Sequence, residues 1–277
     1  MPAARHHYYV RVLSALTVLP APAYVVSDAH LGFAHRDVER SLVRFLRSLE
    51  GRAGSLVING DLFEFWFEWR RVMPRGTFRI LAAIADLHDA GVPVLMVAGN
   101  HDCWGGEILR DDVGIDFRVD PWEGDVAGWR TRVEHGDGLR GREDRGYRAL
   151  RHVLRNRVAI RLFRWIHPDF GSWLASRSSH ASRNYTARDG GAGLRESATR
   201  RLGAGDLDLL VYGHSHVAEL RRIGDAVYAN AGSWLDQPTF LRVTPERIEL
   251  RRWTDDPALP EGVSLNALDR VTEKALT

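Results

Sequence analysis

The sequence contains little cysteine and little lysine, and it has no long uninterrupted apolar run. Cys103 is its one cysteine, so an intramolecular disulfide cannot form and a disulfide-stapled secreted scaffold is excluded. A cytoplasmic protein is therefore expected. Lys274 is its one lysine, so arginine carries almost all positive charge. This bias indicates either the codon usage of a GC-rich genome or a preference for bidentate contacts with phosphate.

The most apolar stretch of the chain is Val10–Val26, near the N-terminus. Arg11 and two prolines interrupt it, and it is too short for a membrane-spanning helix. Ala21-Pro22-Ala23 is faintly similar to a signal cleavage site. Tyr24-Val25-Val26, however, leads directly into the polar pair Ser27-Asp28, as a first β-strand would. We therefore expect a strand here and no signal peptide.

The length and the charge balance are those of a globular protein. The 277 residues include 44% apolar residues, and 38 Lys plus Arg against 36 Asp plus Glu give a net charge of +2. The apolar content excludes a disordered chain. The small net charge, taken over the whole chain, excludes a strongly basic nucleic-acid binder. We expect a single domain over residues 1–277, with a peripheral C-terminal extension at 254–277.

Strand-like and helix-like periodicities alternate in the first hundred residues. The resulting βαβαβ order predicts parallel strands with a ligand site at their C-terminal ends. A second, more antiparallel sheet is predicted from Phe117 to Glu134 and from Asp208 to Trp253, where strands follow at hairpin spacing. The strands expected in the first part are Ala23–Ser27, Ser55–Asn59 and Val92–Ala98, the helices are Val38–Leu49 and Phe78–Ala90, and the later strands include Val217–Arg222, Ala226–Asn230, Phe240–Val243 and Ile248–Trp253.

Between these β-rich parts, Leu139–Arg201 is expected to be helical and to form an inserted cap. It contains 15 arginines and 5 acidic residues, a net charge of +10 that leaves −8 for the rest of the chain. Arg148, Arg151 and Arg155 recur at helical spacing, which predicts a basic amphipathic helix. Such a helix could lie on anionic lipid, grip substrate phosphates, or be solvated. Its apolar face would comprise Tyr147, Leu150, Val153, Leu154, Val158, Leu162, Trp165 and Ile166.

Five short polar clusters each directly follow a predicted strand. Residues i and i+2 of an extended chain point the same way, so Asp28 can converge with His30, and His214 with His216. The side chains are oxygen and imidazole ligands without a thiolate, which favours Mn, Fe, Zn or Co. The clusters are Asp28-Ala29-His30, Gly60-Asp61, Gly99-Asn100-His101-Asp102, Glu134-His135-Gly136-Asp137 and Gly213-His214-Ser215-His216.

The candidate ligands outnumber what one metal ion needs. They suit two ions roughly 3.5–4 Å apart that share one carboxylate. Such a pair lowers the pKa of a bridging water, supplies hydroxide near neutral pH and clamps the oxygens of an in-line phosphoryl displacement. We expect two divalent ions, manganese first, with iron, zinc or cobalt as alternatives. The candidate ligands are Asp28, His30, Asp61, Asn100, His135, His214 and His216.

These five clusters, in this order, resemble the pattern of the calcineurin-like metallophosphoesterases between Asp28 and His216. The resemblance implies a four-layer α/β/β/α sandwich, here with an inserted helical cap. It implies one ion held by Asp28, His30, Asp61 and His216, and a second held by Asp61, Asn100, His135 and His214. It also implies that His101 assists the leaving group or steadies the phosphate, with Asp102 as its orienting carboxylate.

A narrower resemblance is to the UDP-2,3-diacylglucosamine diphosphatases of lipid A synthesis. It rests on Gly60-Asp61-Leu62-Phe63-Glu64-Phe65-Trp66, on Gly136-Asp137-Gly138-Leu139 where the cap begins, and on the cap itself. It implies hydroxide attack on the pyrophosphate of a nucleotide-linked diacyl sugar, releasing lipid X and UMP at the cytoplasmic face of the inner membrane. Phe63, Phe65, Trp66, Phe67 and Trp69 could contact acyl chains or could cover the core.

The same resemblance implies substrate contacts in the later part of the cap, together with Asn100 and His101. The chain departs from the best-known branch of that subfamily at His101, where that branch has arginine. Alternatives are a phosphodiesterase or nucleotide pyrophosphatase without a lipid substrate, a nuclease, and an inactive scaffold. Few aromatics are interleaved with the basic residues, so a nucleic-acid partner is not expected. The implied cap contacts are Arg177, Ser182, Arg183, Asn184 and Arg188.

Overall fold

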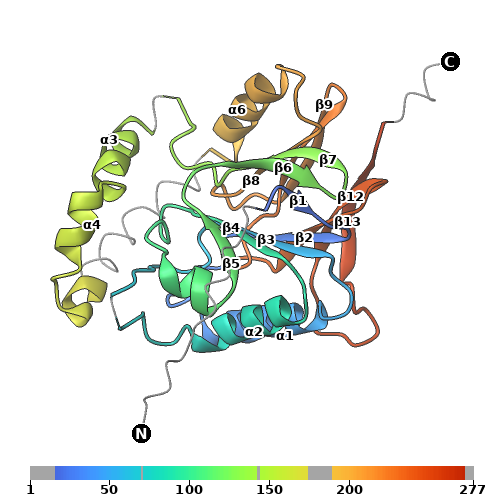
Figure 1. Ribbon diagram of the computed structural model, residues 1–277. Helices are drawn as coiled ribbons and strands as arrows, with labels where there is room; N and C mark the ends of the chain where they lie inside the picture. The colour runs from blue at the N-terminus through green and yellow to red at the C-terminus, as the bar shows by residue number, and fades with distance from the viewer. Residues whose placement is uncertain (1–15, 70, 142–143, 174–188, 272–277) are drawn as a thin grey trace, which may run out of the picture.

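The computed structural model describes residues 16–69, 71–141, 144–173 and 189–271. Two β-sheets stack face to face in its body (Figure 1). In the seven-stranded sheet, β2 to β5 are parallel and β11 to β13 are antiparallel. Its spatial order is β13 (Val263–Asp269), β12 (Arg247–Arg252), β11 (Thr239–Val243), β2 (Ala23–Val26), β3 (Ser55–Asn59), β4 (Val94–Val97) and β5 (Ile115–Arg118).

The six-stranded sheet is mixed. Its central strands β7, β8 and β10 are parallel, whereas β6 and β9 pair antiparallel to β7 and β10. Its spatial order is β1 (Val18–Leu19), β6 (Trp122–Val126), β7 (Trp129–Val133), β8 (Leu209–Tyr212), β10 (Ala226–Asn230) and β9 (Glu219–Ile223).

Side chains along a strand alternate between the two faces of its sheet, so a strand buried on both faces contributes to two separate core clusters. In β3, Leu56 and Ile58 pack in one core cluster, while Val57 packs in another between the two sheets. Successive strand residues point to opposite faces, so this strand is buried on both sides and is apolar throughout. In β8, Leu209 faces the cluster between the sheets and Leu210 faces a third cluster.

Helices cover the outer face of each sheet (Figure 1). The helices α1 (Arg36–Ser48) and α2 (Phe78–Asp89) pack on the seven-stranded sheet, and α6 (Ala192–Leu202) packs on the six-stranded sheet. The molecule is therefore an α/β/β/α sandwich, which confirms the predicted fold class. A short π-helical turn, η1 (Ile108–Asp112), precedes β5.

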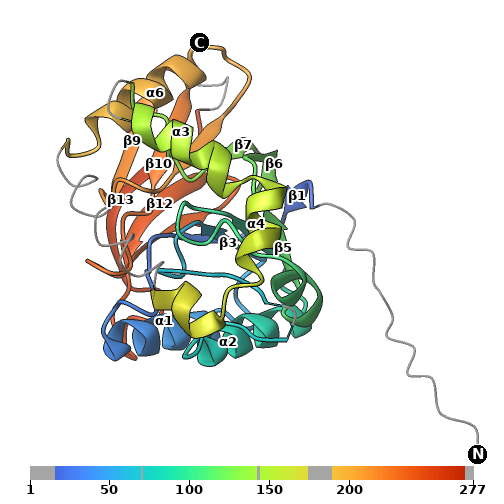
Figure 2. The ribbon, with the colours of Figure 1, turned by 90° about the vertical axis from the view of Figure 1, so that its left-hand side faces the viewer.

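The predicted cap contains α3 (Arg145–Leu154) and α4 (Arg157–Phe163), which stand beside the sandwich and face the viewer in Figure 2. Its last predicted part is instead α6, which belongs to the sandwich because it packs on the six-stranded sheet. Aromatic side chains join the cap to the body. The ring centroid of Phe163 lies 4.8 Å from that of Phe67 and 5.1 Å from that of Trp104. The indole of Trp69 donates a hydrogen bond to the Ile166 carbonyl at 3.1 Å.

The structure corrects the sheet assignment of the later strands. The predicted strands Phe240–Val243 and Ile248–Trp253 belong to the seven-stranded sheet as β11 and β12, because β11 pairs with β2. The predicted C-terminal extension contributes β13 at the edge of that sheet. Among the described residues, no helix has the length and apolarity needed to cross a membrane.

Replacing Phe45 tests the packing of α1 on the seven-stranded sheet. This ring is 1% exposed and lies between Tyr24, Trp234 and Phe240. We expect Phe45→Ala to lower the free energy of unfolding by about 3–5 kcal/mol, because it leaves a cavity among rings from β2, β11 and the turn at Trp234. Urea unfolding would measure the loss. Phe78→Ala, at a residue 59% exposed, is the control and should change stability by about 0.5 kcal/mol or less. If Phe45→Ala lowered the free energy of unfolding no more than Phe78→Ala does, the placement of Phe45 in the core would be contradicted.

Candidate metal centre

The candidate site lies where strands of both sheets end. Asp28, Asp61 and Asn100 follow β2, β3 and β4 of one sheet, and His135 and His214 follow β7 and β8 of the other. At these strand ends the chain turns with left-handed backbone conformations, which non-glycine residues rarely adopt. Six described non-glycine residues have positive φ, and five of them are predicted ligands: Asp28 (53°), His30 (47°), Asp61 (51°), His214 (62°) and His216 (59°).

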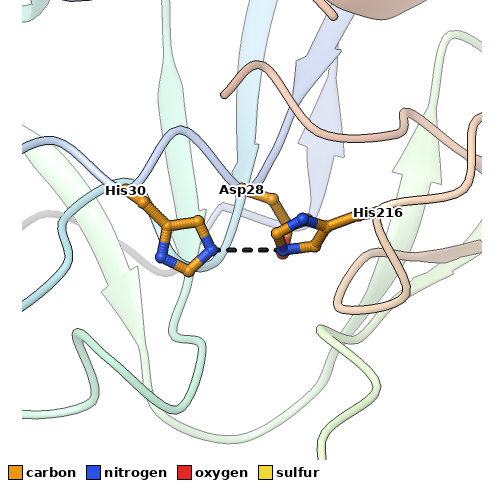
Figure 3. Close-up of side chains that lie close together, drawn as sticks. All are labelled: Asp28, His30 and His216. Carbon is orange, nitrogen blue, oxygen red and sulfur yellow. Dashed lines mark hydrogen bonds and ion pairs between the residues drawn. The ribbon is translucent and has the colours of Figure 1, made fainter. Parts of the chain in front are cut away.

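The first group of side chains is Asp28, His30 and His216 (Figure 3). The Nε2 atoms of His30 and His216 are 3.2 Å apart, and His216 Nε2 lies 3.4 Å from Asp28 Oδ1. The ligand atoms of these three residues all lie within 4.8 Å of one another. They could therefore hold a single metal ion.

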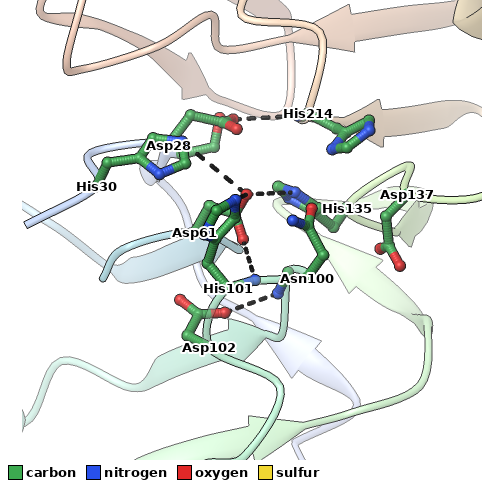
Figure 4. Close-up of polar contacts among 12 residues, drawn as sticks. Asp28, His30, Asp61, Asn100, His101, Asp102, His135, Asp137 and His214 are labelled. Carbon is green, nitrogen blue, oxygen red and sulfur yellow. Dashed lines mark hydrogen bonds and ion pairs between the residues drawn. The ribbon is translucent and has the colours of Figure 1, made fainter. Parts of the chain in front are cut away.

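The second group is Asp61, His135 and His214, with Asn100 beside it (Figure 4). Asp61 Oδ2 is 3.2 Å from His135 Nε2 and 4.0 Å from His30 Nε2. This carboxylate thus lies between the two groups. The structure brings together all seven predicted ligands in an arrangement that could hold two metal ions.

The surroundings of the ligands fit a cation. The buried Oδ1 of Asn100 has no hydrogen-bond donor among the described residues. A Cβ on Gly99 would collide with Asp61 Oδ1, and one on Gly60 would collide with His135 Nδ1. Glycine is therefore required at both positions for the loops to approach this closely. An acceptor that is buried without a donor is the arrangement expected of a metal ligand.

The electrostatics indicate that Asp61 needs positive charge beside it. Burial opposes ionisation of Asp61, but the rings of His135, His101 and His30 outweigh it and hold its pKa well below its usual value. Burial likewise lowers the pKa of His135, yet Asp61 raises it well above the usual value. Burial and the charge of His135 lower the pKa of His214 to about 4. A divalent cation beside Asp61 would supply such a positive charge.

His101 points toward the same centre, with its Nε2 4.0 Å from Asp61 Oδ2. Its Nδ1 donates to the Glu64 carbonyl at 2.9 Å. The structure differs from the prediction that Asp102 orients this ring. The two oxygens of Asp102 instead accept from the backbone N–H groups of Gly99 and Leu62, at 2.8 Å each. Asp102 therefore joins the two loops that carry Asp61 and Asn100.

Sequence reasoning missed two acidic residues behind the histidines. Glu64 Oε2 lies 3.0 Å from His30 Nδ1, and Asp236 Oδ2 lies 2.9 Å from His216 Nδ1. A carboxylate behind a metal-binding histidine fixes the tautomer and the orientation of the ring. Glu64 lies in the Gly60–Trp66 motif. The local sequence does not indicate, however, that Glu64 contacts His30 or that Asp236 contacts His216.

The aromatic segment after Asp61 serves mainly the fold. Phe63 and Trp66 are buried in the core and stack at 4.6 Å, while Phe67 and Trp69 pack on Phe163 of the cap. Phe65 alone in this segment is half-buried, its ring 6.3 Å from that of Phe163. Of the two interpretations weighed for these aromatics, the structure favours covering the core.

The structure also corrects the role expected for three cap arginines. Arg148 donates to the carbonyls of Gly138, Arg140 and Gly141, and Arg151 donates to the carbonyl of Asp137. Arg155 lies between the carboxylates of Asp120 and Asp137. These side chains hold the loop at the start of the cap, because α3 packs with its basic side against that loop. They do not form a free basic face.

Asp137 links this loop to the metal ligand His135. It is 4% exposed and accepts a 2.6 Å hydrogen bond from the hydroxyl of Tyr147 in α3. Burial would raise the pKa of Asp137, but His135, His214, Tyr147 and Arg151 together lower it. The cap is therefore tied to the site through a buried carboxylate. The predicted substrate contacts Arg177, Ser182, Arg183, Asn184 and Arg188 lie outside the described residues.

Comparisons with known proteins define the class. The family described as Calcineurin-like phosphoesterase matches residues 21–218, and this chain belongs to it. The chain is 35% identical over 164 residues to a UDP-2,3-diacylglucosamine hydrolase of Porphyromonas gingivalis, covering 58% of this chain and 63% of that protein.

A protein with the same name from Neisseria meningitidis is 30% identical over 230 residues, covering 80% of this chain and 94% of its own length. A solved structure of Vacuolar Protein Sorting 29 from Cryptosporidium parvum aligns with 89% of this chain and 95% of its own, at 12% identity and a TM-score of 0.45. Its match to the phosphoesterase family makes the chain a metallophosphoesterase and a hydrolase.

Asp102→Asn tests whether this carboxylate is structural. We expect the free energy of unfolding to fall by about 1–3 kcal/mol, because an amide N–H₂ would face a buried backbone N–H. Urea unfolding measures the effect. Asp37→Asn, at a side chain 69% exposed, should change stability by about 0.5 kcal/mol or less. Unchanged stability with lost hydrolysis would instead support the orienting role first predicted for Asp102.

Proposed function

We propose that this protein is a UDP-2,3-diacylglucosamine hydrolase, which cleaves the pyrophosphate bond of its substrate and releases lipid X and UMP. The main support is the convergence of six aspartate and histidine ligands, with Asn100 beside them, in a chain that aligns over 80% of its length with a hydrolase of that name. The alternative is a phosphodiesterase or nucleotide pyrophosphatase of the same family whose substrate carries no lipid.

We assign one metal ion to Asp28, His30, Asp61 and His216, and the other to Asp61, Asn100, His135 and His214, with manganese as the metal. When bound, two divalent ions would polarise phosphoryl oxygens and lower the pKa of a coordinated water. The protein's part is to direct imidazole nitrogens inward. His135 Nδ1 donates to the Asn59 carbonyl at 2.9 Å, so in the neutral ring Nε2 presents its lone pair to the site.

His101 is proposed to act on the leaving group or the phosphate. Since its Nδ1–H is held by the Glu64 carbonyl, Nε2 faces the site and is the atom that can carry or release the transferred proton. Asn100 and His101 would contact the phosphates. The remaining substrate contacts are proposed in the cap, at Arg177, Ser182, Arg183, Asn184 and Arg188.

A substrate comparison tests this function. We expect metal-dependent hydrolysis of detergent-solubilised UDP-2,3-diacylglucosamine, abolished by EDTA and restored by Mn²⁺. His101→Ala should lower kcat about 10²–10⁴-fold through loss of proton transfer, while His88→Ala on α2 leaves kcat unchanged. Release of UMP is the measurement. Equal turnover of UDP-N-acetylglucosamine, which carries an N-acetyl group but no fatty acyl chain, would contradict the lipid substrate without contradicting the metal assignment.

We further propose that the enzyme works in the cytoplasm, peripherally on the inner membrane, and that its cap binds the lipid surface. Five of the eight residues in the predicted apolar face of the cap are exposed. Arg161 of α4 and Arg164, directly after α4, are also exposed and could contact anionic headgroups. The exposed residues of this cap face are Leu150, Val153, Val158, Leu162 and Trp165.

Vesicle binding tests the cap face. Leu162 is 65% exposed and Trp165 is 89% exposed, so glutamate at either position should not disturb the core. We expect each change to weaken sedimentation with phosphatidylglycerol vesicles about tenfold or more, because each removes roughly 1.5–3 kcal/mol of apolar burial. Phe78→Glu, on α2 and 59% exposed, is the matched control and should bind as the wild type does. Equal weakening by all three changes would rule out a specific cap contact.

A further inference from the structure

Two carboxylates lie directly behind the histidines of one of the two groups. Glu64 is 7% exposed, and its Oε2 accepts from His30 Nδ1 at 3.0 Å. Asp236 lies on the loop between β10 of the six-stranded sheet and β11 of the seven-stranded sheet. Its Oδ2 accepts from His216 Nδ1 at 2.9 Å. Each carboxylate thus fixes Nδ1 as the protonated nitrogen and leaves Nε2 for a cation.

The second group is held differently. His135 donates from Nδ1 to a neutral backbone carbonyl, that of Asn59. The backbone N–H of His214 donates to Asp28 Oδ2 at 3.2 Å, and among the described residues the His214 ring forms no ion pair within 4.0 Å. Among the ligand histidines, the anionic partners therefore serve one side of the site, around Asp28, His30 and His216. Glu64 also lies 4.0 Å from Nδ1 of His101, which is not one of the ligands.

We propose that Glu64 and Asp236 are positioning residues that selectively strengthen metal binding at the position held by Asp28, His30 and His216. The inference rests on the proposed two-metal function. A carboxylate behind a ligating imidazole holds the ring in its binding orientation and stabilises the positive charge that the ring shares with the ion. Loss of such a partner typically weakens metal binding 10–100-fold.

The two residues offer complementary variants. Asp236 has a side chain 59% exposed, so Asp236→Asn leaves the fold intact and removes only the charge behind His216. Glu64→Gln keeps a hydrogen-bond acceptor for His30 without the charge, whereas Glu64→Ala removes both. We expect a graded loss of affinity, with the glutamine variant retaining more binding than the alanine variant.

Matched controls are present in the same chain. Glu68 is also buried, at 6% exposure, but its oxygens accept from the backbone N–H groups of Gly106 and Ile108. Asp255 has a side chain 51% exposed and pairs with Arg44. Glu68→Gln and Asp255→Asn therefore remove comparable charges away from the histidines.

The experiment measures Mn²⁺ bound to the chelator-stripped full-length protein across a range of free Mn²⁺, by elemental analysis and by electron paramagnetic resonance. We expect the wild type and both controls to bind two equivalents and to show a spin-coupled pair. In Glu64→Gln and Asp236→Asn, one equivalent should bind as in the wild type and the other about 10–100-fold more weakly. At intermediate Mn²⁺ these variants should show the signal of an isolated ion.

The possible failures are distinguishable. Two equivalents with unchanged affinities in Asp236→Asn and Glu64→Gln would overturn this inference and leave the proposed function standing. Equal weakening of both equivalents would overturn the selectivity on which the inference depends. A wild-type protein that binds no Mn²⁺ would overturn the proposed function, and this inference with it.

Discussion

The buried carboxylate of Asp61 is the constraint on which the rest of the structure depends. It is 2% exposed, and an ionised group removed from water is stable only beside opposite charge and hydrogen-bond donors. Those partners come from different elements: His135 from the six-stranded sheet, and the backbone N–H of His101 from the loop after β4, 2.9 Å from Asp61 Oδ1. The two sheets must therefore stack so that their strand ends meet at Asp61.

The core between the sheets sets this alignment. Val57 of β3 and Val211 of β8 pack in the same buried cluster, only a few residues before Asp61 and His214. Left-handed backbone at five ligand positions costs of order 1–2 kcal/mol per residue, which a large core can offset. The site is thus a strained set of loops held by an apolar interior, and the strain lies where the ligands converge.

Much of the site could be predicted from the sequence, because each polar cluster directly follows a strand. We predicted that Asp28 converges with His30 because alternate residues of an extended chain point the same way. In the structure the physical reason is different, because the backbone turns left-handed at both residues. Partners distant in sequence could not be predicted. Neither the pairing of β11 with β2 nor the contact of Asp236 with His216 has a local signal, because each depends on how the loops pass between sheets.

The cap shows why charge counting alone misleads. Its arginines suggested a free basic surface, yet Arg148 and Arg151 donate to carbonyls of the loop at 137–141. What α3 and α4 leave exposed includes Leu150, Val153, Val158 and Leu162, together with Arg145 and Arg161. That loop also carries Asp137, which holds Tyr147 of α3 and lies two residues from His135. Any displacement of α3 must break this hydrogen bond to a buried carboxylate or move Asp137 with it, so the position of the cap and the geometry of the metal ligands are physically linked.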